Sequence, residues 1–176
     1  GLVYEFTKEA IAEAKLKAQS EAIEKVLPSF EELGETFKVA AENGEDTIEI
    51  FPAYQDDQLV GYAVKTFTNQ GYSGYISIMA GIDNSGNFTG YEVLEHDETP
   101  GLGSKMNEWF RNEEKPAQSV IGKNPESTEF EVTKDGGDID GITASTITSR
   151  AFLEALKRAY RAYEEQEDLN TGSAGQ

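Results

Sequence analysis

Five hydroxyl side chains fall within seven consecutive positions late in the sequence: Thr143, Ser145, Thr146, Thr148 and Ser149. They stand at the predicted start of an amphipathic helix. The first turn of a helix has N–H groups without intrahelical acceptors and a partial positive charge, so it stabilises a phosphate group. Hydroxyls there can donate further hydrogen bonds, and one can be esterified. A simple helix N-cap needs only one such residue, and composition alone leaves both interpretations open.

A second unusual segment, residues 96–103, follows a predicted strand and has the sequence His-Asp-Glu-Thr-Pro-Gly-Leu-Gly. Gly101 and Gly103 lack a Cβ, so the backbone N–H and C=O groups of this segment can approach a flat ligand closely. A Pro-Gly turn that only changes the direction of the chain is the simpler interpretation of the same residues.

Composition excludes several classes of function. The chain has 15 Lys and Arg against 33 Asp and Glu, a net charge of −18, which repels polyanions and makes nucleic acid an unsuitable partner. It has no cysteine and one histidine, His96, so thiol catalysis, iron–sulfur clusters and multi-histidine metal sites are excluded. Carboxylates are too numerous for any pair to indicate hydrolysis. The sequence therefore predicts neither a catalytic residue nor a metal ligand.

The elements that must position these two segments follow from apolar periodicity. Helices are predicted over Tyr4–Leu27, where Ile11, Ala14, Ala18, Ala22 and Val26 form the apolar repeat, and over Ile147–Glu164, whose broad apolar stripe begins at Ile147 and must pack on another element. Strands are predicted over Thr47–Ala53, Val60–Val64, Ile76–Ile82, Phe88–Glu95 and Thr128–Thr133, the last with Phe130 and Val132 on one face. The first four strands form two hairpins, with turns at Asp56-Asp57 and at residues 83–87. The predicted fold class is therefore α+β: a mostly antiparallel sheet built from hairpins, with an N-terminal and a C-terminal helix packed on it.

Three parts are expected along the chain. Residues 1–28 form an N-terminal helix, residues 29–165 form the ligand-binding domain, and residues 166–176 form a disordered polar tail. Because the sequence begins with Gly1 rather than Met, we expect a membrane anchor to have been removed upstream.

Both segments resemble motifs of the FMN-binding domain family, which includes the G subunit of Rnf complexes and the C subunit of the sodium-pumping NADH:quinone reductase. The family motif Asp-x-x-(Ser/Thr)-Gly-Ala-Thr is similar to residues 140–146, Asp-Gly-Ile-Thr-Ala-Ser-Thr. Ala144 stands in place of the motif's Gly, and Ser145 in place of its Ala. The Glu-Thr-Pro-Gly-Leu-Gly motif is met without change at Glu98–Gly103. The likeness extends from about Ala10 to Ala162.

The resemblance implies a flavoprotein with FMN joined covalently, through its phosphate, to the side chain of Thr146. Thr143, Ser145, Thr148 and Ser149 would surround the phosphate. The resemblance places Glu98, Thr99, Pro100, Gly101, Leu102 and Gly103 along the isoalloxazine ring, with Lys105 near a reduced flavin. Tyr72 would stack on the flavin or fill the sheet face, and Trp109 and Met106 would cover the ring or, as the simpler interpretation, belong to the core. Asp140 would shape the loop or mark it for modification.

The same resemblance implies an electron-carrier subunit of an ion-translocating oxidoreductase complex rather than a stand-alone enzyme. Its partners would be other subunits of an Rnf- or Nqr-type membrane complex and a flavin transferase that attaches the FMN. It would be held at the cell inner membrane by a single-pass anchor, with this domain extracytoplasmic. Two alternatives remain open: a non-redox extracytoplasmic module that binds an anion or other ligand reversibly, and a structural subunit without flavin.

Overall fold

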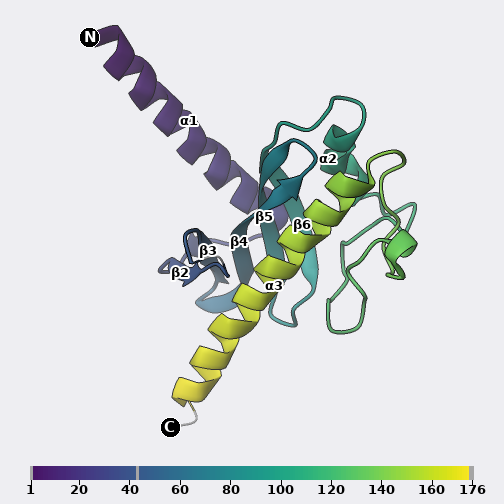
Figure 1. Cartoon of the computed structure of the whole chain (residues 1–176). Helices are drawn as coiled ribbons and strands as arrows, with labels where there is room; N and C mark the ends of the chain where they lie inside the picture. Colours follow the sequence, from purple (N-terminus) through teal and green to yellow (C-terminus); the bar gives the residue numbers. More distant parts are fainter. Residues whose placement is uncertain (1, 43, 175–176) are drawn as a thin grey trace.

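The computed structural model describes residues 2–42 and 44–174, with side chains described for residues 10–42 and 44–168. The helices are α1 (Leu2–Val26), α2 (Met106–Trp109) and α3 (Thr146–Ala174), with short 3-10 turns at Gly103–Lys105 and Thr133–Asp135. The strands are β1 (Glu32–Leu33), β2 (Phe37–Ala40), β3 (Thr47–Gln55), β4 (Gln58–Gly71), β5 (Gly74–Asp83) and β6 (Phe88–Glu95). Figure 1 shows α3 lying along the sheet and α1 projecting away from it.

The sheet is antiparallel throughout, in the order β1-β3-β4-β5-β6, with β2 also paired to β3. Strand residues alternate between its two faces. Ile50, Val64 and Ile78 belong to the main core with α3, whereas Ala63 and Met79 pack with the last turns of α1. The two long helices therefore cover opposite faces, and the predicted α+β class is confirmed.

Two sequence predictions about the helices need correction. Ile11 belongs to the apolar repeat that predicts the first helix but is 53% exposed, because the side chains of α1 that are buried against the sheet begin only at Ala22. Residues 166–174, expected to be disordered, continue α3 to Ala174. Gln166 is buried, and the Tyr62 hydroxyl donates a hydrogen bond to the Glu167 carboxylate at 2.5 Å. The tertiary contacts of Gln166 and Glu167 thus lie beyond the predicted apolar stripe, in a helix that continues past it. Residues 175–176 lie outside the described part.

The strand predicted at Thr128–Thr133 is also wrong. Among the described residues this segment forms only a single β-bridge, Val132 to Ile139. Phe130 and Val132 are nevertheless buried in the main core, as their alternation predicted. The apolar pattern identified the buried side chains but not the backbone conformation.

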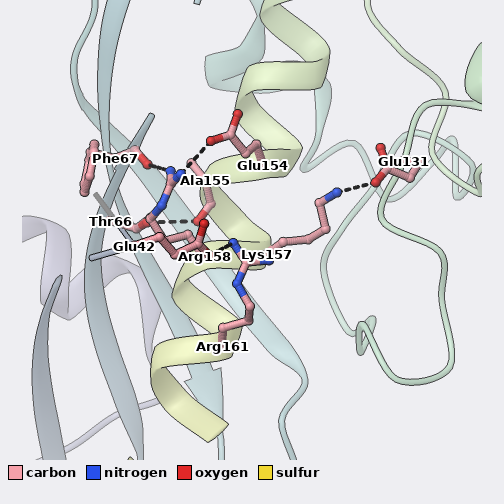
Figure 2. A network of polar contacts seen from close by, with 9 residues as sticks. All are labelled: Glu42, Thr66, Phe67, Glu131, Glu154, Ala155, Lys157, Arg158 and Arg161. Atoms are coloured by element: carbon pink, nitrogen blue, oxygen red, sulfur yellow. Dashed lines mark hydrogen bonds and ion pairs between the residues drawn. The ribbon is translucent and has the colours of Figure 1, made fainter. Parts of the chain in front are cut away.

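Polar contacts fix α3 along β4 (Figure 2). The Thr66 hydroxyl donates to the Ala155 carbonyl at 2.9 Å, and the Arg158 guanidinium donates to the Phe67 carbonyl at 2.5 Å. Arg158 also pairs with Glu154 at 2.6 Å. Two further ion pairs join α3 to neighbouring loops: Lys157 with Glu131, and Arg161 with Glu42. These contacts set where the N-terminus of α3 lies, and with it the hydroxyl-rich segment.

Buried tyrosines make the fold sensitive to alkali. Burial raises the pKa of Tyr91 to about 12; its hydroxyl donates to the Met106 carbonyl at 2.6 Å. Burial also raises the pKa values of Tyr62, Tyr160 and Tyr163. An unfolded tyrosine has a pKa of about 10, so the folded state holds these protons more tightly. Their contribution to stability is complete below pH ~10 and is lost as the pH rises toward and beyond 12.

We expect Tyr91→Phe to reduce the loss of stability between pH 8 and 11.5 by about 2 kcal/mol, because Tyr91 ionises in the unfolded chain within this range but holds its proton in the folded protein. Urea unfolding at several pH values between 8 and 11.5 measures this. Tyr72→Phe, a change at an exposed tyrosine, is the matched control and should leave the slope unchanged. Equal slopes for wild type and Tyr91→Phe would contradict the prediction.

Candidate functional site

A pocket of about 460 Å³ lies at the N-terminus of α3, where the two unusual segments meet. Its walls come from the β4–β5 turn, the loop after β6, and the entry into α3. The lining residues are Tyr72, Thr99, Leu102, Gly103, Ala144, Ser145, Thr146, Ile147 and Thr148. The volume is within the range of about 300 to 1,000 Å³ that small-molecule sites occupy. Three segments far apart in the sequence thus form one site.

The entry into α3 is a tight turn. The Ser145 N–H donates to the Ile142 carbonyl at 3.0 Å, and Ala144, the third residue of this turn, has φ of 63°. Positive φ at this position is the mark of a type II turn, where glycine is favoured. Ala144 adopts the left-handed conformation despite its Cβ, so this turn forms with alanine at a position that favours glycine.

We expect Ala144→Gly to stabilise the protein by about 0.5 to 1 kcal/mol. A non-glycine residue in the left-handed region costs about 1 to 2 kcal/mol, and the added freedom of unfolded glycine offsets part of the gain. Urea unfolding measures the change. Ala144→Val should destabilise by about 1 kcal/mol or more, because a β-branched side chain fits this conformation poorly. If both variants were less stable than wild type, the positive φ of residue 144 would not be what limits the stability of this turn.

The hydroxyls of this segment have different roles. Ser149 is fully buried: its hydroxyl donates to the Ser145 carbonyl at 2.9 Å and accepts the Ile142 N–H at 2.8 Å. Thr148 donates to the Glu98 carboxylate at 2.5 Å. Thr146, the first residue of α3, lines the pocket, is half-buried, and has no described side-chain hydrogen bond. Among the residues that the structure describes, the Thr146 hydroxyl therefore has no hydrogen-bond partner, and it belongs to the first turn of α3.

The loop after β6 is held by short-range hydrogen bonds. The N–H groups of Leu102 and Ser104 both donate to the Thr99 carbonyl, at 3.1 and 3.3 Å, and the Gly101 N–H donates to the Ser104 hydroxyl at 3.0 Å. Gly101 has φ of 77°. A Cβ on Gly103 would lie 2.7 Å from the Thr148 hydroxyl oxygen, so only glycine allows this loop to pack against α3. The glycines thus shape the loop as well as leaving its backbone bare.

The Glu98 carboxylate forms hydrogen bonds with two of the segments that line the pocket, the β4–β5 turn and the first turn of α3. It accepts the backbone N–H groups of Tyr72 at 2.9 Å and Ser73 at 2.8 Å, in addition to the Thr148 hydroxyl. The backbone N–H of Glu98 donates to Nδ1 of His96 at 3.0 Å. His96 is therefore part of the hydrogen-bonded frame of the loop.

The pocket wall includes only some of the residues predicted for the cofactor. Tyr72, Thr99, Leu102, Gly103, Ser145, Thr146 and Thr148 lie in it, whereas Thr143, Ser149, Glu98, Pro100, Gly101 and Lys105 do not. Thr143 and Lys105 are exposed outside the wall. Their placement beside the cofactor stays a prediction.

Two wall residues, Ala144 and Ile147, were not predicted. The periodicity predicts Ile147 in the packed stripe of the last helix, yet it is 49% exposed and lines the pocket. It lies in the first turn of α3, ahead of Ala151, the first buried apolar residue of this helix, and the apolar periodicity of the sequence does not distinguish the two positions. With Leu102 and the 70% exposed Tyr72, it gives the pocket an apolar rim.

Two residues considered as covers for a flavin ring have structural roles instead. Met106 is fully buried in the main core. Trp109 donates its indole N–H to the Asp140 carbonyl at 2.8 Å, and the Asp140 N–H donates to the Ala117 carbonyl at 2.7 Å. These bonds fix the start of the motif segment, so Asp140 shapes the loop through its backbone.

The described residues define a ligand-binding domain whose pocket combines an apolar rim with a helix N-terminus. Within residues 2–42 and 44–174, no helix has the length and apolar composition needed to cross a membrane. Among the side chains that the structure describes, no group of three or more His, Asp or Glu residues is placed to hold a metal ion.

Comparison with known proteins places this domain in a family. Residues 71–161, which include the whole pocket, match the FMN-binding domain family. The G subunit of the ion-translocating oxidoreductase complex of Aliivibrio fischeri (strain ATCC 700601 / ES114) is 33% identical over 185 residues, covering 97% of this chain and 85% of the relative. The corresponding proteins of Salmonella typhi and Escherichia coli (strain K12), which have the same name, are 35% and 34% identical, covering 90% and 89% of this chain and 79% of each relative. The chain therefore belongs to the FMN-binding domain family.

Proposed function

We propose that this protein carries FMN joined by a phosphoester to Oγ1 of Thr146 and that it relays electrons as a subunit of an ion-translocating oxidoreductase complex. The observation that carries the proposal is the unengaged Thr146 hydroxyl in the pocket, at the first turn of α3. Family membership and the names of the relatives supply the cofactor and the kind of complex.

The pocket suits an anionic, aromatic cofactor. Its polar end has helical N–H groups that lack intrahelical acceptors, which favour phosphate. Its rim has Tyr72, Leu102 and Ile147, whose apolar surfaces suit a flat ring. The only Arg adjacent to the segment, Arg150, is paired with Asp135 at 2.7 Å. Because Arg150 is engaged and the protein has a net charge of −18, electrostatic attraction for an anion is weak. A covalent bond to Thr146 would keep the anionic cofactor in the pocket without that attraction.

The linkage is a simple exchange at phosphorus. Thr146 Oγ1 forms the new P–O bond while the P–O bond to the leaving group of the flavin nucleotide donor breaks, and the hydroxyl proton leaves with the released oxygen. The protein therefore gains the mass of FMN less one water. Bound FMN supplies the redox chemistry, because it accepts and gives up electrons, and the protein residues set its position and surroundings.

The remaining parts of the proposal concern partners and place. A flavin transferase would attach the cofactor, and other subunits of an Rnf- or Nqr-type complex would exchange electrons with it. Since ion translocation requires a membrane, we propose that the domain works at the cell inner membrane, on its extracytoplasmic side, held by a single-pass anchor.

Intact-mass measurement tests the proposal. The protein produced with a matching flavin transferase should gain one FMN less one water and should stay yellow after denaturation. Without the transferase it should be colourless, which controls for adventitious flavin. Wild-type protein that lacks the added mass although the transferase modifies a known substrate would refute the covalent linkage. Flavin released on denaturation would favour the reversible binding module.

A further inference from the structure

Glu98 lies beneath the pocket and outside its wall. The residue is only 4% exposed, and it does not line the pocket. A buried carboxylate is expensive unless hydrogen-bond donors satisfy it. Three donors do so here, from two separate elements: the β4–β5 turn and the first turn of α3. The groups that stabilise the carboxylate are therefore the groups that it holds in place.

The contacts are specific for a carboxylate. The N–H groups of Tyr72 and Ser73 meet different oxygens, Oε1 and Oε2, and the Thr148 hydroxyl also meets Oε1. An amide in place of the carboxylate has one acceptor oxygen and one NH2 group, which only donates. Glutamine would therefore lose at least one of these bonds and place a donor against a donor.

The bonded partners are adjacent to the functional groups of the pocket. Tyr72 provides part of the apolar rim, and Thr148 is two residues from Thr146 in the same helical turn. Gly103 belongs to the loop after β6, which forms the third wall of the pocket, and it packs against both Glu98 and Thr148. One carboxylate thus fixes the distances between the rim, the loop and the attachment point.

We propose that Glu98 is a positioning residue of the flavin site: it holds the Tyr72 turn, the Thr99–Gly103 loop and the N-terminus of α3 in one arrangement, and so orients the attached cofactor. This inference rests on the proposed function for its cofactor, but its structural part concerns the protein alone. It assigns Glu98 no contact with the flavin.

Two measurements on Glu98→Gln test the proposal. In the flavin-free protein, hydrogen exchange of the Tyr72 and Ser73 amides should accelerate about tenfold or more, the effect of one lost charge-assisted hydrogen bond. In flavinylated protein, the flavin content should match wild type, while the fluorescence anisotropy and visible circular dichroism of the flavin should fall toward those of free FMN. Asp97→Asn removes a neighbouring exposed carboxylate and should change none of these signals.

The outcomes separate this proposal from the proposed function. Wild-type amide exchange and wild-type flavin signals in Glu98→Gln would overturn the positioning role, and so would equal effects of Asp97→Asn. Absence of flavin from wild type would refute the covalent linkage, and the exchange measurement would still decide whether Glu98 holds the turn. If Glu98→Gln does not fold, Thr148→Val removes one of the three donors with little change of shape. Unchanged flavin anisotropy in that variant, or unchanged exchange where no flavin is attached, would then overturn the proposal.

Discussion

Thr146→Ala, produced with the flavin transferase, should contain no covalent flavin, whereas wild type should contain one FMN per chain. The expected loss is complete because the variant has no Oγ1 to form the phosphoester. The fold should survive: Thr146 is half-buried and has no described side-chain hydrogen bond, so the change in the free energy of unfolding should stay within about 0.5 kcal/mol. Intact mass and urea unfolding measure the two effects.

Ser145→Ala is the matched control, since it removes the adjacent hydroxyl from the same wall of the pocket. It should keep the flavin, because Thr146 remains available. A flavin-bearing Thr146→Ala protein would show that another hydroxyl is the acceptor, and peptide mapping would identify it. Loss of flavin from both variants, with both folded, would show that the transferase needs the intact segment, so attachment would have to be mapped in wild type.

Local sequence patterns predicted the parts of the fold that depend on local structure. The second hairpin is an example: the strand predicted at Phe88–Glu95 has the same bounds in the structure, because the turn signal before it is strong. The turn at Asp56-Asp57 is also confirmed, and both residues have positive φ, which Asp tolerates better than most residues. These turns are determined within a few residues, so the sequence reveals them.

The site was predictable in outline, through its two motif segments, but not in its internal bonding. Glu98 illustrates the limit. Its partners are 25, 26 and 50 positions away, and no local pattern indicates which donors a buried carboxylate will meet. Ile147 illustrates another limit, since helical periodicity identifies an apolar position without showing where the supporting sheet ends. The roles of both residues depend on tertiary packing.

The position of α3 connects the core to the site. Phe152, fully buried, stacks on Phe110 with ring centroids 4.3 Å apart and an angle of 9° between the rings. It also forms a T-shaped contact with Tyr91, with ring centroids 4.8 Å apart. Phe152 is six residues after Thr146, or about 9 Å along the helix. This aromatic cluster therefore supports the half of α3 that forms the pocket.

Phe152→Ala should lower the free energy of unfolding by about 3 to 5 kcal/mol, because it removes a fully buried ring and leaves a cavity. Urea unfolding monitored by circular dichroism measures the loss. If the m-value is unchanged, the shift in the urea midpoint reflects a change in the free energy of unfolding. Ile147→Ala is the matched control: it truncates an exposed side chain of the same helix and should cost less than about 0.5 kcal/mol. The contrast between these two apolar residues, five positions apart, separates core packing from the pocket rim. A loss below about 1.5 kcal/mol for Phe152→Ala would mean that the polar contacts along β4, rather than the aromatic cluster, hold α3 and Thr146 in place.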